Sequence, residues 1–193
     1  IVPIFPSYHA VRILGGSISG YWGIVSVIRT SDNEVVKQIS APGVPWSVAV
    51  SPDGALVYVT NDNIGSDFVT VIRTSDNTVV DYIYGIGSRS RGISLSPDGM
   101  QAYVSSFMSA TVAVIEIATK MVDTISIGGF PSLEGVAVAP NGQHVYVADT
   151  NHFLHVIKVS DKTVQTIPLS GDAHTIAFTP DGNYAYVAAG ILS

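Results

Sequence analysis

"VAVSPDGALVYVT", residues 48–60, is one of four copies of the same pattern in this chain. The other copies are "ISLSPDGMQAYVS" at 93–105, "VAVAPNGQHVYVA" at 136–148 and "IAFTPDGNYAYVA" at 176–188. In each copy two alternating apolar runs flank a Pro-Asp-Gly or Pro-Asn-Gly turn, and the copies recur at intervals of roughly 40–45 residues. A repeat of this length predicts a fold in which one small unit is used several times.

The turn itself has a physical explanation. Proline presets its own φ at the second turn position, and the aspartate side chain can accept a hydrogen bond from the backbone ahead of it. The glycine that follows, Gly54 in the first copy, tolerates a positive φ that a β-carbon would resist. The pattern therefore predicts a tight β-hairpin in each copy.

A second block repeats in step with the hairpin. "VSVIRTSDNEVV" from Val25 is matched by "VTVIRTSDNTVV" from Val69, and weaker copies begin at Val112 and Leu154. Each complete unit thus reads as four short strands rich in Val, Ile and Tyr, and no stretch predicts a helix of ten residues or more. Four antiparallel strands in a unit of this length are typical of a β-propeller blade, so the predicted fold class is all-β.

The motifs "VYVTN" (57–61), "AYVSS" (102–106), "VYVAD" (145–149) and "AYVAA" (185–189) resemble the YVTN family of β-propeller repeats. The resemblance covers about residues 23–193. It implies that the strand before each SPDG turn is innermost and that the strand after Ser-Asp-Asn is outermost. It also implies a surface-layer or periplasmic type of protein, which makes an extracytoplasmic location the expectation.

On this plan the whole chain is one propeller repeat domain with about four and a half repeats. The expected blades are 1–41, 42–86, 87–130 and 131–171, followed by a half blade at 172–193. Residues 1–16 fit only as a degenerate first hairpin. Since propellers of the family commonly have seven blades, three arrangements are open: part of a longer propeller, an arc completed by another chain, or an unusual five-unit closure. We favour the first.

Composition excludes several classes of function. A net charge of −6 and only 12% charged residues argue against nucleic acid or an anionic membrane as a partner. The chain has no cysteine, so disulfides, thiol catalysis and thiolate metal sites are excluded. No apolar run is long enough for a membrane span, and no secretory leader is recognised at the start.

The best candidate site is a set of residues that differ between otherwise similar units. They stand eight positions before each turn glycine, at the start of the inner strand: Trp46, Arg91, Glu134 and His174. Because ligands of propellers often sit at one mouth of the central channel, these four are the predicted ligand-binding residues. The alternative is that they are loop-edge residues free to vary because nothing packs on them.

Other candidates are weaker. His152 and His155 are three positions apart, on or just before a predicted strand. Their side chains should therefore point to opposite faces of the sheet and not share a metal ion. We expect them to face solvent or to lie between two blades. The loop "TNDNIGSD" at 60–67 offers Asp and Asn oxygens of the kind that calcium binds, but it lacks the spacing and the terminal glutamate of an EF-hand loop. Because turns select the same residues for backbone reasons, a turn is the prediction. No catalytic constellation, metal site or cofactor is predicted. Arg29 and Arg73 are expected to pair locally with Asp32 and Asp76.

Two functional hypotheses follow. The first is a non-enzymatic binding or scaffold propeller that presents loops and a central pocket to a protein, a glycan or a small ligand, with self-association through open blade edges as an option. The second is an enzyme or electron-transfer subunit, because similar propellers include lactonases and the heavy subunits of quinoprotein amine dehydrogenases. Glu134 and His174 are the residues that would favour the second.

Overall fold

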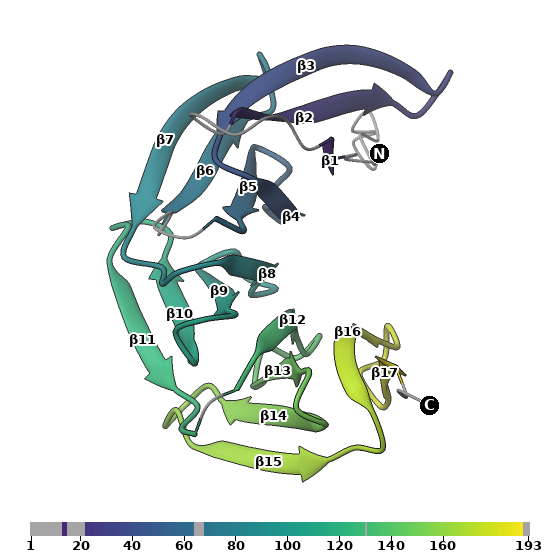
Figure 1. Ribbon diagram of the computed structural model, residues 1–193. Helices are drawn as coiled ribbons and strands as arrows, with labels where there is room; N and C mark the ends of the chain where they lie inside the picture. The colour runs from purple at the N-terminus through teal and green to yellow at the C-terminus, as the bar shows by residue number, and fades with distance from the viewer. Residues whose placement is uncertain (1–12, 15–21, 64–67, 130, 191–193) are drawn as a thin grey trace.

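The computed structural model describes residues 13–14, 22–63, 68–129 and 131–190. These residues form an all-β structure, and no helix occurs among them, as the repeat predicts. Antiparallel sheets follow one another in chain order around a common centre, which gives the arc in Figure 1. The first hairpin expected at 1–16 lies mostly outside the described residues.

Three of the sheets have four strands each, in the spatial orders β4-β5-β6-β7, β8-β9-β10-β11 and β12-β13-β14-β15. The innermost strands of these sheets and of the last one are β4 (Pro45–Val50), β8 (Ser90–Leu95), β12 (Leu133–Val138) and β16 (Asp172–Phe178). The second strands are β5 (Leu56–Asn61), β9 (Gln101–Ser106), β13 (His144–Asp149) and β17 (Ala185–Gly190). The third strands are β6 (Phe68–Arg73), β10 (Thr111–Glu116) and β14 (Phe153–Lys158).

The outermost strands complete the sheets. They are β7 (Thr78–Tyr84), β11 (Val122–Ser126) and β15 (Val164–Pro168). The first sheet is described with three strands, β1 (Ile13–Leu14), β2 (Trp22–Arg29) and β3 (Glu34–Pro42). The last sheet is described with two, β16 and β17. The inner and outer positions agree with the propeller plan (Figure 1); whether the whole chain is one domain stays a prediction.

The SPDG turns have the predicted chemistry. Gly54, Gly99, Gly142 and Gly182 all have φ of 71–72°. In the first turn Asp53 Oδ1 accepts hydrogen bonds from the Ala55 N–H at 3.0 Å and from the Ser51 hydroxyl at 2.5 Å. The turns also contact one another, because a β-carbon on Gly99 would lie 3.3 Å from Pro52 Cδ of the preceding sheet.

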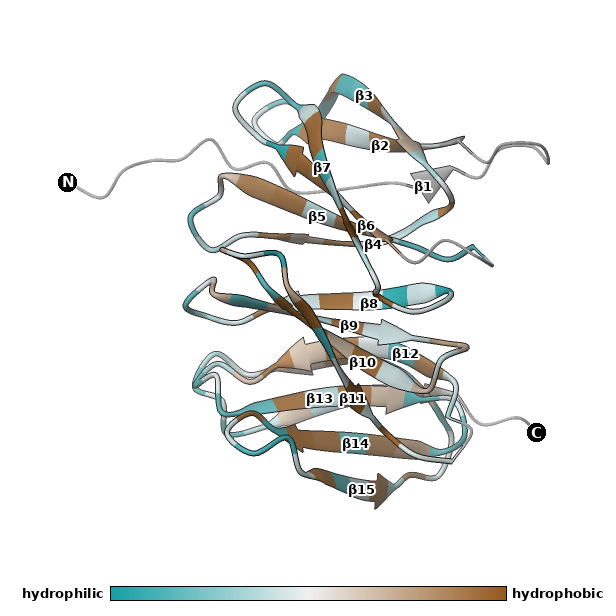
Figure 2. Ribbon diagram, turned by 90° about the vertical axis from the view of Figure 1, so that its left-hand side faces the viewer, coloured by the Kyte–Doolittle hydropathy of each residue, from teal (hydrophilic) through white to brown (hydrophobic). Residues whose placement is uncertain are grey.

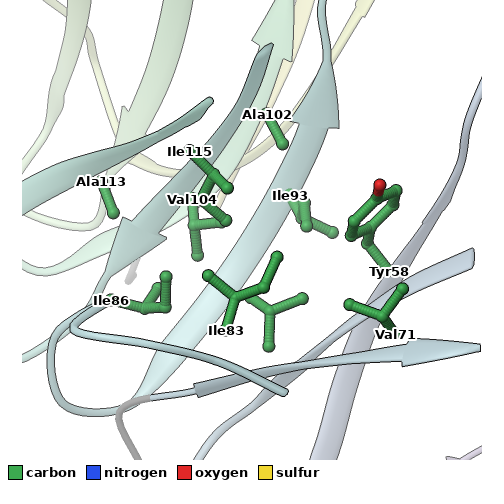
Figure 3. Packing of buried hydrophobic residues seen from close by; sticks show 10 residues of the cluster. Tyr58, Val71, Ile83, Ile86, Ile93, Ala102, Val104, Ala113 and Ile115 are labelled. Carbon is green, nitrogen blue, oxygen red and sulfur yellow. The ribbon is translucent and has the colours of Figure 1, made fainter. Parts of the chain in front are cut away.

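Apolar side chains from facing sheets form the core. Figure 2 shows hydrophobic segments along the strands with hydrophilic residues concentrated at the hairpins. Between the second and third sheets, Tyr58, Val71 and Ile83 pack against Ile93 and Val104 (Figure 3). Burial of this kind contributes on the order of 25 cal/mol per Å² of apolar surface removed from water, so the sheets hold one another together face to face.

The tyrosine four residues after each turn glycine shows how strongly the burial of a side chain depends on the presence of the next sheet. Tyr58 and Tyr103 are each 2% exposed, whereas Tyr186 on β17 is 68% exposed. The first two are covered by the following sheet, and no further sheet is described beyond β17. The repeat position itself is therefore built for burial against a neighbour.

Hydroxyl groups tie adjacent inner strands together. Each inner strand has a register irregularity near its start, for example between Ser90 and Ile93 in β8. There the Gly92 N–H donates to Ser105 Oγ at 2.9 Å, and the Ser105 hydroxyl donates to the carbonyl of Glu134 in the next sheet. Thr60 repeats the arrangement one sheet earlier, accepting from the Ser47 N–H and donating to the Arg91 carbonyl at 2.6 Å.

Glycine allows this close approach. A β-carbon on Gly92 would lie 2.6 Å from the Glu134 carbonyl oxygen, and one on Gly135 would lie 2.6 Å from that of His174. Ser94 also links two inner strands, since its hydroxyl accepts a hydrogen bond from the Val138 N–H at 3.1 Å.

We expect Ser105→Ala to lower the free energy of unfolding by about 2 kcal/mol, because it leaves the Gly92 N–H and the Glu134 carbonyl without their shared partner. Urea unfolding followed by far-UV circular dichroism measures this change. Ser75→Ala, which removes an exposed hydroxyl from a turn, is the matched control and should leave stability unchanged. Equal stability of the two variants would contradict a role for the Ser105 bridge.

Candidate functional site

The four predicted site residues stand at equivalent places on neighbouring strands. Trp46, Arg91 and Glu134 are the second residues of β4, β8 and β12, and His174 is the third residue of β16. Since these inner strands lie side by side around the centre (Figure 1), the four residues, each near the start of its strand, lie on the same side of the arc.

Arg91 connects two of the other three. Its Nη1 makes an ion pair with Glu134 Oε1, and its Cζ lies 4.9 Å from the centroid of the Trp46 ring. The Arg91 and Glu134 side chains are only 11% and 14% exposed, whereas Trp46 remains 46% exposed. His174 is exposed and no direct contact joins it to the other three, although its charge acts on Glu134.

Asp62 is a member of this cluster that the sequence interpretation missed. Its side chain is 3% exposed and binds two guanidinium groups: Arg89 Nε at 2.5 Å and Nη2 at 3.0 Å, and Arg91 Nε at 3.1 Å. The prediction that the loop at 60–67 is merely a turn is wrong for Asp62, which follows β5 directly and reaches the next sheet. Residues 64–67 of that loop lie outside the described part.

Phe107 completes the cluster. The Arg91 Cζ lies 3.8 Å from the Phe107 ring centroid, so the guanidinium is held between Phe107 and Trp46. The Arg89 Cζ lies 5.0 Å from the same ring. Cation–π contacts of this kind are worth about 0.5–2 kcal/mol each, more as the cation is desolvated. We call these six residues the mouth cluster: Trp46, Asp62, Arg89, Arg91, Phe107 and Glu134.

A sequence signal for the missed residues does exist. Asp62 and Phe107 both stand eight residues after a turn glycine, where Thr150 and Gly190 stand in the later units. This position is as variable between the repeats as the position eight residues before the glycine. Arg89 adds a local signal of its own, since its φ of 57° is unusual for a residue with a β-carbon.

Burial controls the protonation of Glu134. Removal from water raises the pKa of the Glu134 carboxyl, and the Asp62 charge adds to that effect, while the charges of Arg91 and His174 oppose it. The net pKa lies above its ordinary value of 4.5. The hydrogen bonds that Arg89 donates to Asp62 raise the pKa of Arg89, which stays charged.

A second buried polar group lies away from the mouth cluster. His155 Nε2 lies 3.2 Å from Asp149 Oδ2 and its Nδ1 lies 3.0 Å from the Thr166 hydroxyl, with His155 and Asp149 both buried. Asp149 Oδ1 also accepts the backbone N–H groups of Ser132 and Asn151. Burial raises the pKa of Asp149, but these hydrogen bonds outweigh it and the pKa lies below its ordinary value.

These contacts give His155 a structural role. They fasten the connection between the third and fourth sheets, since Ser132 precedes β12.

His152 is not on the strand but in the preceding turn, with φ 68°, where its Nε2 pairs with Asp172 Oδ1 at 2.9 Å. Across the described ranges no three metal-ligating side chains come together, and Arg29 and Arg73 pair with Asp32 and Asp76 as expected. The described chain also has no helix long and apolar enough to cross a membrane.

Comparison with known proteins agrees with this architecture. Residues 25–190 match the family described as "Lactonase, 7-bladed beta-propeller". The chain belongs to this family. The lactonase-family chain is also 36% identical, over 173 residues, to the uncharacterized protein YwhL of Bacillus subtilis (strain 168). That match covers 87% of this chain and spans 36% of the length of YwhL.

For the mouth cluster we expect Asp62→Asn to lower the free energy of unfolding by about 3 kcal/mol, because it leaves two partly buried guanidinium groups without their shared carboxylate. Thermal and urea unfolding both measure this loss. Asp76→Asn removes one partner of an exposed arginine pair and should have little effect, since surface pairs contribute little. A similar response of the two variants would show that Asp62 is not a structural centre.

The raised pKa of Glu134 has a defined consequence for stability. A carboxyl whose folded-state pKa lies above its unfolded value stabilises the fold at low pH, and this contribution is lost as pH rises through the folded pKa. The stability of the wild type relative to Glu134→Gln should therefore fall as pH rises from below 4.5. Urea unfolding at a series of pH values checks the sign, and a rising difference would contradict it.

Proposed function

We propose that this lactonase-family chain is part of a non-enzymatic binding propeller whose central mouth holds a ligand. The observation that carries the proposal is the mouth cluster. It joins side chains from three consecutive sheets, fixes them by ion pairs, and still leaves the Trp46 ring half exposed. A site that is organised before its ligand arrives loses little conformational entropy on binding.

The surroundings of the cluster support a small ligand or a glycan over a large protein partner. Binding sites for small molecules are typically concave, with apolar or aromatic walls and a few fixed polar groups. Trp46 and Phe107 supply the aromatic groups, and Arg89, Arg91 and Glu134 supply the polar ones. The resemblance to YVTN repeats supports placing this binding function at the cell surface or in the periplasm.

A second candidate is lactone hydrolysis. It is favoured by the family description and by the raised pKa of Glu134, a property that general bases often have. In such a reaction Glu134 would take a proton from water as the water oxygen bonds to the lactone carbonyl carbon. The ring C–O bond would then break, and the leaving oxygen would receive a proton.

An amide-resolved NMR screen of the chain with mixtures of small polar molecules tests the binding function. We expect the strongest shifts at the amides of residues 46–47, 89–92 and 132–135, and we expect Trp46→Ala to abolish them. Tyr184→Ala, which removes another exposed aromatic ring, should leave them unchanged. Shifts that are absent from these amides, or that survive Trp46→Ala, would overturn the proposal.

Proton release from γ- and δ-lactones separates the two candidate functions. The binding proposal expects no turnover above that of Glu134→Gln. Turnover that is lost in Glu134→Gln but kept in Glu116→Gln would favour the hydrolase, because Glu116 lies on β10 and is bonded to Gln101.

A further inference from the structure

Several polar atoms of the mouth cluster have no hydrogen-bond partner among the residues that the structure describes. Among the described residues, Arg91 uses Nε and Nη1, Arg89 uses Nε and Nη2, and Glu134 uses Oε1. Arg91 Nη2, Arg89 Nη1 and Glu134 Oε2 are therefore uncommitted within the described part of the chain. They comprise donors from two guanidinium groups and one carboxylate acceptor.

The charges of the cluster are balanced. Two arginines face two carboxylates, and the ion pairs join them into one network: Arg89 with Asp62, Arg91 with Asp62, and Arg91 with Glu134. An anionic ligand would have to displace Glu134 from Arg91 or remain beside it as a like charge, and either change costs free energy in a partly buried site. A neutral ligand leaves the network intact.

An aromatic surface lies next to these atoms. Trp46 and Glu134 both interact with the Arg91 guanidinium, so the half-exposed indole and the Glu134 carboxylate belong to one local site. A ligand that spans the two must present an apolar face and a polar edge together. A hydroxyl group suits the edge, because it can donate to Glu134 Oε2 and accept from an arginine N–H at the same time.

We propose that the mouth binds a neutral, hydroxyl-rich ring, a pyranose sugar being the simplest example. The C–H face of the ring lies on Trp46, and neighbouring hydroxyls bond to Glu134 and to the free arginine nitrogens. This assignment names the ligand class for the binding function above and rests on it. His174 is exposed on β16, in the sheet that follows the sheet of Glu134. It bounds the proposed site on that side.

Glu134 then determines the choice between neutral and acidic sugars. Glu134→Gln keeps the shape of the side chain but removes one negative charge, which leaves one arginine charge uncompensated. The wild type should prefer neutral sugars, and the variant should shift toward sugars that carry a carboxylate. A residue with a purely structural role would weaken both kinds of ligand alike.

The test is titration of the full chain with methyl glucoside, methyl galactoside and methyl mannoside, and with glucuronic acid as the acidic counterpart. Amide shifts at residues 46–47, 89–92 and 132–135 give both the location and the affinity of binding. We expect at least one neutral glycoside to bind there about tenfold or more tightly than glucuronate. Trp46→Ala should lose that binding by about tenfold or more, Trp46→Phe should recover part of it, and Tyr184→Ala should not change it. In Glu134→Gln the preference for neutral over acidic sugar should fall by about tenfold or reverse.

Two outcomes would overturn the inference. If glucuronate, or inorganic phosphate added as a further probe, shifts the mouth amides more strongly than every neutral glycoside, the ligand class is wrong while binding at the mouth stands. If no sugar shifts the mouth amides, the sugar assignment fails, and the mixed screen described above decides separately whether the mouth binds any other ligand. Equal losses of neutral and acidic binding in Glu134→Gln would also remove Glu134 as the selecting residue.

Discussion

The approach of one inner strand to the next is the constraint on which this structure depends. At the register irregularity of β4 and of β8, a hydroxyl on the second strand accepts a backbone N–H of the inner strand and donates onward to a carbonyl of the neighbouring sheet. Gly92 and Gly135 keep the space for that contact, because a β-carbon at either position would meet backbone at 2.6 Å. Apolar burial between the sheets then follows from a spacing that these polar contacts define.

The same contacts position the mouth cluster. The two carbonyls that receive the bridging hydroxyls belong to Arg91 and Glu134, the residues whose side chains form the central ion pair. In each of these two residues a hydroxyl of the preceding sheet therefore holds the backbone carbonyl, while the ion pair holds the side chain. This explains how a guanidinium group can be kept between Trp46 and Phe107 while it serves two carboxylates. Such double restraint is what a preorganised site requires.

Much of this architecture was predictable from the repeat. The turn glycines, the four strands of each unit and the inner position of the strand before the turn all follow from short-range rules that act within about a dozen residues. For Trp46, Arg91 and Glu134 the sequence predicted equivalent positions in successive units, but not the contacts between their side chains. Asp62 was missed because the presence of an aspartate in a turn needs no explanation beyond the turn itself. Its actual partners, Arg89 and Arg91, belong to the next unit and are distant in the sequence. The partners of His155 were not predicted either, since Asp149 and Thr166 approach it through strand pairing and not through sequence spacing.

The bridging hydroxyl is not present at every junction. Ala148 stands where Thr60 and Ser105 stand in the preceding units, so the fourth sheet offers no side-chain oxygen to the carbonyl of His174. The β12–β16 junction therefore lacks, among the described residues, the side-chain bridge that the two preceding junctions have. The His174 carbonyl instead lies against Gly135, where a β-carbon would be 2.6 Å from its oxygen. Arg91 and Glu134 are thus each held by a hydroxyl from the preceding sheet, whereas His174 is positioned by the close approach of backbone alone.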